Sequence, residues 1–409
     1  MSRLEDLIQQ LCPDGVEYRP FGEIAVIIRG ASPRPIKNYI TTDNDGINWI
    51  KIGDVKQGSK YITNTAEKIT IDGANKSRFV KEGDFILSNS MSFGRPYIMK
   101  TQGCIHDGWL AISQFSDYFN TDFLYHLLNT NKYQKIMRQK ASFGGAVQNL
   151  NADIVRELKM PIVPIEIQDE IVRILDNFTE LTAELTAELT ARKKQYEYYR
   201  DKLLTFGDDV PMKKISDIAV DIYRGSGIKR DEITKDGFPC IRYGEIYTSY
   251  NISFEKCISH TSVDVVLKPK YFEYGDIIFA ITGENIEEIG KSVVYLGNEK
   301  CIAGGDTVVL KHNQEPRYMS YVLSTSEAQR QKSKGRVKSK VVHTSIPALK
   351  EITIPVPDIK IQKKIADILD RFDTLCNDLS SGLPAEIEAR KKQYEYYRDK
   401  LLNFDEVKH

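Results

Sequence analysis

Residues 191–206 read ARKKQYEYYRDKLLTF and residues 389–404 read ARKKQYEYYRDKLLNF, so fifteen of sixteen positions agree at an offset of 198 residues. Weaker matches lie upstream, in the same order in both halves. They pair EIAVIIRG (23–30) with DIAVDIYRG (217–225), WIKIGD (49–54) with CIRYGE (240–245), and EGDFIL (82–87) with YGDIIF (274–279). An ordered set of matches is the signature of an internal repeat. The chain of 409 residues therefore consists of two copies of one unit.

The first part of each copy has the pattern of a globular domain. Short β-branched and aromatic runs, such as INWIKIG and TVVLKH, alternate with Gly-Asp and Asp-Gly turns, which is typical of short strands. Helical stretches recur near the end of each domain, at 121–140 and 316–332. The sequence therefore predicts an α+β fold with a curved, mostly antiparallel sheet in each copy.

A helix is expected after a proline-bounded segment in each copy, because proline restricts the preceding residue to extended conformations. The prolines are Pro161 and Pro164 in the first copy, and Pro355 and Pro357 in the second. Apolar residues then follow mostly three–four spacing, which is typical of a coiled-coil seam. In the first copy they are Ile167, Ile171, Ile174, Phe178, Leu181, Leu185, Leu189, Tyr196, Tyr199 and Leu203; in the second, Ile361, Ile365, Ile368, Phe372, Leu375, Leu379, Tyr394, Tyr397 and Leu401.

Two such helices are expected to pack as an antiparallel coiled coil that separates the globular domains. A helix of about 40 residues is about 60 Å long. The first copy has LTAELTAELTA at 181–191, whereas the second has SSGLPAE at 380–386, where Gly382 and Pro384 predict a kink. The expected domains are 1–160 with a short N-terminal helix, a spacer helix at 161–208, a second domain at 209–354 and a second spacer helix at 355–409, kinked near 382–384.

Composition limits the functional classes. The chain has 57 basic and 57 acidic residues, so a DNA-binding role would need locally concentrated positive charge. The six cysteines form no C-x-x-C pair and the six histidines no zinc pattern, which favours reduced thiols in a cytoplasmic protein without a metal. Glu5 and Asp6 argue against a signal peptide, and no apolar run is long enough to cross a membrane.

Catalytic motifs are not recognisable. Gly290-Lys291-Ser292 has no glycine five residues earlier, and Glu284, Glu287 and Glu288 nearby would repel a phosphate. The chain contains no Pro-Pro pair, so it lacks the Asn/Asp-Pro-Pro-aromatic pattern of amino-methyltransferases. We expect no catalytic residue and no cofactor on this chain.

The layout resembles the specificity (S) subunit of type I restriction–modification systems over nearly the whole chain. The most specific elements are MPIVPIEIQDEIVRIL (160–175) and IPVPDIKIQKKIADIL (354–369), together with the paired RKKQYEYYRDKLL endings. The resemblance implies a non-catalytic subunit in which each recognition domain reads one half of a bipartite DNA target and the helices set the spacing. It also implies two methyltransferase (M) subunits and two restriction/motor (R) subunits as partners, which would carry S-adenosylmethionine, ATP and Mg²⁺.

The repeat segment is identical even at positions outside a coiled-coil seam. We interpret this as one surface presented twice to two copies of the same partner, since aromatic residues and arginine are enriched at interfaces. A recent gene duplication without selection on the surface is the alternative. The predicted partner-binding residues are Tyr196, Tyr198, Tyr199, Arg200, Tyr394, Tyr396, Tyr397 and Arg398.

Candidate DNA-binding residues are basic or amide side chains in loops that differ between the copies. Basic groups give affinity for phosphates, and Arg, Lys, Asn and Gln read base edges. The candidates are Arg34, Lys37, Lys51, Asn89, Arg95, Lys140 and Gln148 in the first copy, and Arg224, Lys229, Arg230, Arg242, Asn285, Lys334, Arg336 and Lys338 in the second. Two other functions stay open: a stand-alone DNA-binding protein or nuclease built on the same repeat, and a coiled-coil adaptor that does not bind DNA.

Overall fold

The computed structural model describes residues 3–55, 58–89, 93–144, 147–333, 336–338, 341–377 and 381–407, with the backbone alone at 142–144, 147–149, 336–338 and 341. The chain forms two compact units. The first unit comprises residues 1–184 and 388–409, and the second unit comprises residues 185–387. Each unit therefore combines the globular domain of one copy with helical segments from both copies.

The first unit contains two five-stranded sheets, whose strand orders are β3-β6-β4-β10-β7 and β2-β11-β8-β9-β5. Each sheet is antiparallel except for one parallel pair, β4 with β10 and β5 with β9. The bounds of these strands are β2 Val26–Arg29, β3 Ile40–Thr41, β4 Ile47–Ile50, β5 Tyr61–Ile62, β6 Glu67–Ile69, β7 Arg78–Val80, β8 Phe85–Ser88, β9 Pro96–Met99, β10 Gly103–Ile105 and β11 Trp109–Ser113. Two small pairs are β1 (Glu17–Pro20) with β14 (Lys159–Ile162) and β12 (Ser142–Gly144) with β13 (Val147–Asn149).

The second unit repeats this topology strand for strand, with sheet orders β17-β20-β18-β25-β21 and β16-β26-β22-β24-β19. The parallel pairs are again one in each sheet, β18 with β25 and β19 with β24. The strand bounds are β16 Ala219–Arg224, β17 Ile233–Thr234, β18 Phe238–Ile241, β19 Ser253–Phe254, β20 Ser259–Thr261, β21 Tyr271–Phe272, β22 Ile277–Ala280, β24 Ser292–Tyr295, β25 Cys301–Ala303 and β26 Thr307–His312. The pair β15 (Met212–Lys214) with β29 (Thr353–Pro355) matches β1 with β14, and β23 (Thr282–Gly283), β28 (Val341–His343) and β27 (Arg336–Lys338) form a further sheet. The predicted α+β fold with mostly antiparallel sheets is confirmed in both copies.

The helices of the two units also correspond. The first unit and the long helix contribute α1 Arg3–Leu11, α2 Phe21–Ile24, α3 Ile71–Asn75, α4 Thr121–Leu128, α5 Asn131–Lys140, α6 Ala152–Arg156 and α7 Ile165–Leu203. The second copy contributes α8 Ile215–Ile218, α9 Tyr243–Thr248, α10 Pro316–Leu323, α11 Ser326–Lys332, α12 Ile346–Lys350, α13 Ile359–Asn377 and α14 Leu383–Leu401, and four 3₁₀ turns are η1 Ile36–Asn38, η2 Ile52–Asp54, η3 Arg230–Glu232 and η4 Val263–Val265. Each predicted helical stretch near a domain end is two helices, because Thr130 and Thr325 cap a new helix with their side-chain oxygens.

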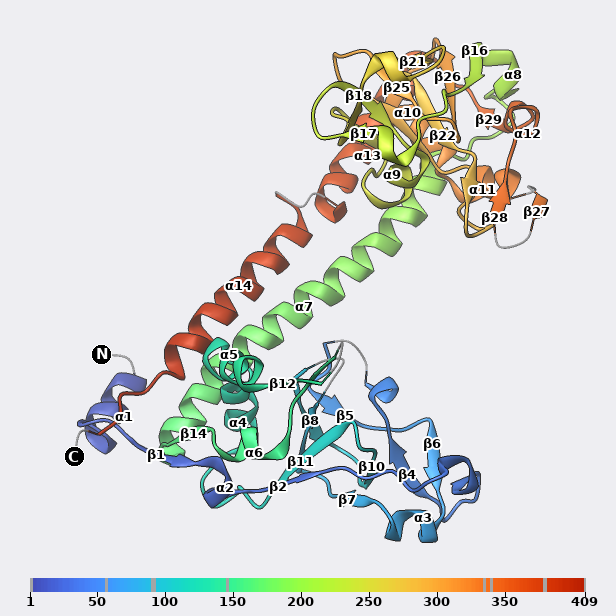
Figure 1. The fold of residues 1–409 in the computed structure, drawn as a ribbon. Coiled ribbons are helices and arrows are strands. Elements are labelled where there is room, and N and C mark those ends of the chain that lie inside the picture. The colour runs from blue at the N-terminus through green and yellow to red at the C-terminus, as the bar shows by residue number, and fades with distance from the viewer. Residues whose placement is uncertain are drawn as a thin grey trace. The chain divides into compact units, whose positions relative to one another are not determined.

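The two copies differ in their long helices (Figure 1). In the first copy α7 runs unbroken over 39 residues, whereas in the second copy α13 ends at Asn377 and α14 begins at Leu383, next to Gly382 and Pro384. Within the first unit Phe178 of α7 stacks on Tyr397 of α14, with ring centroids 5.3 Å apart. Within the second unit Tyr199 of α7 stacks on Phe372 of α13 at 6.2 Å. Within the second unit Lys193 of α7 also lies near Cys376 of α13, so these two helices run antiparallel there.

The predicted seam is wrong at three positions of α13 and at the exposed Leu181 of α7, and Leu379 lies outside the described residues. Ile361, Ile368 and Leu375 are exposed, and the buried face is formed by other residues of this helix: Gln362, Ile365, Ala366, Leu369 and Cys376. The physical reason is that α13 packs against α10 of its own globular domain as well as against α7. A helix that packs against two neighbours buries a different set of residues from the set that a seam between two helices would bury.

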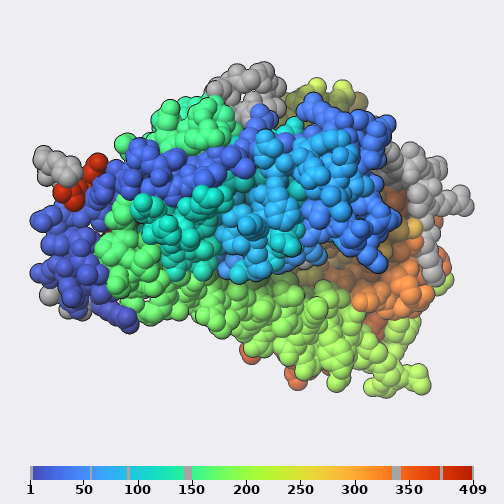
Figure 2. All heavy atoms as spheres, turned by 90° about the horizontal axis from the view of Figure 1, so that it is seen from below, coloured from blue at the N-terminus to red at the C-terminus, as the bar shows by residue number. Residues whose placement is uncertain are grey.

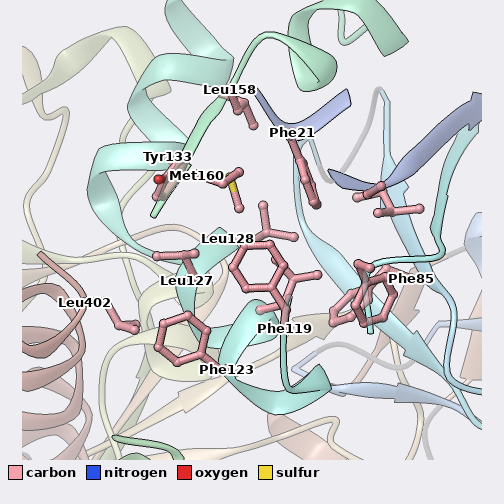
Figure 3. Close-up of a cluster of buried hydrophobic side chains, with 14 of the residues drawn as sticks. Phe21, Phe85, Phe119, Phe123, Leu127, Leu128, Tyr133, Leu158, Met160 and Leu402 are labelled. Atoms are coloured by element: carbon pink, nitrogen blue, oxygen red, sulfur yellow. The ribbon is translucent and has the colours of Figure 1, made fainter. Parts of the chain in front are cut away.

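The core of the first unit extends from the sheets to the C-terminal helix. Phe21, Phe119 and Phe123 are fully buried together, and Phe21 meets Phe119 edge to face at 6.3 Å. Figure 3 shows Leu402, which follows α14, beside Phe123 and Leu127 of α4. The end of the second copy is thus part of the first unit's core, and its burial is a strong reason for the two segments to stay together.

The segments around Val16 and Glu406 lie side by side in the first unit, where the N-terminal and C-terminal colours meet in Figure 2. The Val16 amide donates to the Asp405 carbonyl at 2.9 Å. Gly15 has φ +102°, and a Cβ there would lie 2.5 Å from the same carbonyl oxygen. Only glycine satisfies both the conformation and the close approach. Leu4 of α1 is buried, as the predicted N-terminal helix requires.

Candidate nucleic-acid interface

One strand of each copy, β2 or β16, ends in an arginine that is followed by a glycine, at the same structural position. Arg29 is the last residue of β2 and Arg224 the last of β16, and Gly30 and Gly225 come next. A Cβ on Gly30 would lie 2.1 Å from the carbonyl oxygen of His106, and a Cβ on Gly225 would lie 2.1 Å from that of Gly304. The loop after β10 or β25 therefore passes so close to the strand end that only glycine fits.

Each of these arginines is oriented by that loop. Arg29 Nε donates to the Asp107 carbonyl at 3.1 Å, and Arg224 Nε donates to the Gly305 carbonyl at 2.6 Å. Arg224 also forms an ion pair with Asp306 at 2.6 Å. The carbonyl holds Arg29 without neutralising its guanidinium, so the other N–H groups of Arg29 remain suited to a phosphate or a base edge, whereas Asp306 offsets part of the charge of Arg224.

Each copy has a second basic residue directly after a strand: Lys51 follows β4 and Arg242 follows β18. The amide of Lys51 donates to the Asp54 carboxylate at 2.7 Å, and the amide of Arg242 donates to Glu245 at 3.0 Å. Their side chains also have acidic partners, with Lys51 Nζ 2.6 Å from Glu67 and Arg242 Nε 2.7 Å from the buried Glu245. These contacts fix both side chains and offset part of their charge.

In the second unit these arginines line one hollow, whose volume falls in the range of about 300 to 1,000 Å³ that is typical of ligand sites. Its volume is about 650 Å³, and Arg224, Arg230 and Arg242 line it together with the glycine loop at 304–305. Asp306 is the acidic residue in the lining. We call this group the second basic corner. Three of the predicted DNA-binding residues, which are up to 18 positions apart in the sequence, thus come together here.

The first unit has a corresponding group, the first basic corner, formed by Arg29, Arg34, Lys51 and the loop at 106–108. Arg34 lies 3.3 Å from the Asp107 carboxylate with its side chain largely exposed. The loop is tied to the Lys51 segment, because the Ile52 amide donates to His106 Nε2 at 3.2 Å. Burial lowers the pKa of His106, which keeps this ring neutral as an acceptor. Lys37, in η1, is exposed.

Asn89 has a supporting position beneath the first basic corner. It is 3% exposed, and its amide nitrogen donates to the Asp107 carbonyl at 2.9 Å. The same carbonyl accepts from Arg29, so Asn89 fixes the loop that orients this arginine. The sequence did not mark His106 or Asp107 as site residues, although their loop directly follows β10 as the loop at 304–305 directly follows β25.

The other predicted DNA-binding residues lie apart from the two basic corners. Lys140 is paired with Glu157 at 3.1 Å, Lys229 lies 3.8 Å from Glu232, and Asn285 is exposed and accepts from the Glu287 amide. Arg95 lines a different groove of the first unit, of about 910 Å³, with Lys135 and Arg138 of α5. Lys334 lies outside the described residues, and for Gln148, Arg336 and Lys338 the strand backbone alone is described.

The predicted partner-binding residues divide into buried and exposed groups. Tyr196 and Arg398 are buried against their own unit, and Tyr199 and Tyr397 make the two ring stacks described above. Tyr198 and Tyr396 are each 61% exposed, and Lys202 and Lys400 lie over their rings. Tyr394 Oη is 2.8 Å from His126 Nδ1, and Arg200 and Arg398 bind Asp201 and Asp399.

Asp201 and Asp399 have a role that the sequence did not reveal. Asp399 accepts from the backbone amide of Asn131 at 3.1 Å, and Asp201 accepts from the amide of Ser326 at 3.2 Å. Both amides are at the start of a helix, α5 or α11, where a carboxylate is favourable. Part of the identity between the repeat segments therefore has an intramolecular reason, since each segment caps the same helix in its unit.

No group of three or more His, Cys, Asp or Glu residues among those described is placed to hold a metal ion. Among the described helices, none combines the length and the apolar composition that a membrane span needs.

The chain is similar to known proteins in sequence and in structure. The type I restriction enzyme EcoR124I/EcoR124II specificity subunit of Escherichia coli is 35% identical over 247 residues, which span 60% of this chain and 61% of that protein. This match therefore covers about three fifths of the relative's length. The type I restriction enzyme EcoprrI specificity subunit of Escherichia coli is 25% identical over 405 residues, or 93% of both chains.

The fold is shared with a chain from a structural study of complex assembly and conformational transition of the type I R-M system. The two share 14% sequence identity with a TM-score of 0.68, over 96% of this chain and 98% of the other. The family profile described as the type I restriction modification DNA specificity domain matches residues 13–192 and again residues 207–389. These ranges are the two repeats found in the sequence, and the resemblance noted there is confirmed. The chain belongs to the family of type I restriction modification DNA specificity domains and carries two of them.

Proposed function

We propose that this chain binds a bipartite duplex DNA target, with each unit reading one half-site through its basic corner. The observation that carries the proposal is the repeated geometry, in which Arg29 and Arg224 are held by the same loop carbonyl in the two units. The chain has no net positive charge, so affinity for DNA must come from such local concentrations of arginine. Residues around a shared scaffold differ between the corners, which is what reading two different half-sites requires.

The same proposal assigns the chemistry to partner subunits. Two methyltransferase subunits dock on the exposed Tyr198 and Tyr396 and their lysine neighbours, one on each repeat segment. Two restriction/motor subunits complete the assembly, in the cytoplasm. S-adenosylmethionine, ATP and Mg²⁺ are held by these partners, and the long helices set the spacing between half-sites. Identical exposed residues on two segments support a pair of identical partners.

The experiment compares DNA binding by the full chain, with its methyltransferase partners, across a series of salt concentrations. The variant carries Arg224→Ala and Arg230→Ala. These two are chosen because Arg242 is the ion-pair partner of the buried Glu245, and its loss would disturb the fold. Two lost arginine contacts are expected to reduce target affinity about 10- to 1000-fold, and the salt dependence becomes shallower.

The matched control is Lys213→Ala, which removes an exposed cation from β15 of the same unit. Its affinity should stay within about twofold of the parent. Equal affinity and equal salt slope in the arginine variant and the parent would contradict the proposal. Cleavage of DNA without any partner would favour a nuclease instead, and the lack of salt-dependent DNA binding would favour an adaptor.

A further inference from the structure

A hollow of the second unit contains buried polar groups that have no role in the DNA-binding proposal. We call it the lysine pocket. It has a volume of about 400 Å³ and is lined by α7, by α11 and by the segment that leads into β24. Tyr196, Arg200, Lys291, Ser292 and Lys332 lie in its wall. All of them belong to the second unit.

Lys332 is the unusual residue of this pocket. It is 3% exposed, and its methylene chain packs over Gly290, where a Cβ would lie 3.1 Å from its Cδ. No carboxylate or carbonyl of a described residue hydrogen-bonds its ammonium group. A buried ammonium without an acceptor is costly, so lysine is rarely found in such a place without a partner. Burial, reinforced by the nearby Arg200, lowers the pKa of Lys332 to about 7.

Two hydroxyl groups in the wall are also unsatisfied. Tyr196 Oη and Ser292 Oγ are buried and have no hydrogen-bond partner among the described residues. Both are able to donate to an oxygen acceptor. Buried polar groups in folded proteins are nearly always hydrogen-bonded, and exceptions point to a ligand, an ion or water.

Most of the basic side chains of the pocket are buried or half-buried, and the acidic side chains lie at exposed positions. Arg200 is held by Asp201 at 2.8 Å and lies over the ring of Tyr196. Lys291 donates to two backbone carbonyls, at 3.3 and 3.5 Å. The acidic residues of the lining, Glu197, Glu287 and Glu288, are all exposed. The buried wall is therefore rich in cations and hydroxyl donors, a combination that suits an oxyanion.

The equivalent place in the first unit shows that these groups are not required by the fold. Met137 replaces Lys332, and it packs over Gly94 as Lys332 packs over Gly290, with a Cβ at 3.3 Å from its methyl group. Tyr394, the counterpart of Tyr196, has its hydroxyl 2.8 Å from His126. The first unit thus fills the same position with an apolar side chain and satisfies its tyrosine internally.

We propose that the lysine pocket of the second unit binds a small oxyanion, a carboxylate or a phosphate, through the Lys332 ammonium and the Tyr196 and Ser292 hydroxyls. The oxyanion supplies the negative charge and the acceptors that this pocket lacks. It comes either free from solution or as a carboxylate side chain of a bound protein partner. The inference does not depend on DNA recognition by the basic corners.

The test is titration of the full chain with inorganic phosphate and, separately, with acetate, followed by calorimetry. Lys332→Met copies the residue of the first unit, so this variant is expected to fold. We expect it to weaken phosphate binding at least tenfold without lowering the thermal midpoint of the second unit. Lys213→Met, on an exposed strand, is the matched control and should bind like the parent. No binding by the parent, or equal binding by the parent and Lys332→Met, would overturn the proposal.

A labelling experiment locates the site and separates the two sources. An amine-acylating reagent is applied at neutral pH, where Lys332 is partly deprotonated, and modification is read by peptide mass spectrometry. Phosphate should slow labelling of Lys332 at least tenfold and leave Lys213 unchanged. In a complex with partner subunits, protection of Lys332 before phosphate is added identifies a partner carboxylate, whereas protection after its addition identifies a free anion. Unaltered labelling of Lys332 in every condition would contradict the site.

Discussion

The two units pack the same helical segment against different globular surfaces, and the hydrogen-bond partners of its residues differ between them. In the first unit His126, Asp176 and Tyr394 form a connected network, with 2.8 Å from His126 Nδ1 to Tyr394 and 3.1 Å from Nε2 to Asp176. In the second unit Tyr321 takes the place of His126 and donates to Asp370 at 2.7 Å. Tyr196 is then left without a partner among the described residues.

This difference shows which part of the repeat is fixed and which is adaptable. The aspartate that accepts from the first backbone amide of α5 or α11 has this role in both units, and a stacked Phe–Tyr pair also occurs in both. The tyrosine hydroxyl and its surroundings differ, because they meet residues of the recognition domains that are not the same in the two copies. An unchanging helical segment thus accepts different domains by keeping a few anchors and tolerating variation around them.

The largest expected effect concerns acid stability at a position where the units differ. His312 ends β26, and the first unit has Gln114 at the equivalent position, 198 residues earlier. Burial lowers the pKa of His312 to about 4, so protons bind more strongly to the unfolded chain, and stability is lost as pH falls from about 6.5 towards 4. Between pH 7 and 5 this loss is about 2 kcal/mol in the second unit.

His312→Gln, which copies the first unit, should remove most of that pH-dependent loss. Hydrogen exchange followed by mass spectrometry at several pH values measures the two units separately. The first unit of the same variant is the internal control, because its own pH dependence should not change. An identical pH dependence of the second unit in the parent and the variant would contradict the role of His312.

An effect of similar size is expected from one substitution made at both copies of an identical tyrosine. The Asp176 carboxylate is an acceptor, so His126 Nε2 carries the proton and Nδ1 accepts from the Tyr394 hydroxyl. Tyr394→Phe leaves Nδ1 buried and unpaired, which should cost about 1–3 kcal/mol in the first unit. Tyr196→Phe removes a hydroxyl that has no described partner and should cost less than about 0.5 kcal/mol.

Urea denaturation monitored by hydrogen exchange compares these two variants with the parent. Tyr198→Phe, at an exposed position, serves as the control for the substitution itself. Equal costs at positions 394 and 196 would show that the two units do not differ in the way described.

The smallest effect tests the feature that the units share. Asp399→Ala removes bonds to both the backbone amide and the side-chain amide of Asn131, whereas Asp201→Ala removes one bond to the Ser326 amide. The loss of a helix cap costs about 1 kcal/mol, and the second contact should make Asp399→Ala the more costly of the two. Circular dichroism melts with the matched variants Asp399→Asn and Asp201→Asn show how much of each loss is charge. A null effect of both alanine variants would remove the capping role.

Much of the fold follows from the sequence because it is carried by local patterns. The repeat predicts two α+β units, the prolines at 161 and 355 precede the long helices, and Gly382 with Pro384 coincides with the break between α13 and α14. Arg224 and Arg242, which align with Arg29 and Lys51 of the first copy, line one hollow. The side chains of the seam were predicted less well. Periodicity identifies an apolar face of a helix, but it does not show which other element packs against that face.

By itself, then, the sequence determined the duplication, the class of fold and the basic residues that end the strands, since each of these depends on residues close together in the chain. Tertiary structure alone decided the partners of the identical tyrosines, because His126 and Tyr394 are separated by 268 positions. Tertiary structure alone also placed Lys332 in a buried wall without an acceptor; Met137 has the equivalent position in the first unit. Burial and pairing depend on packing between distant segments, and no local pattern encodes which segments meet.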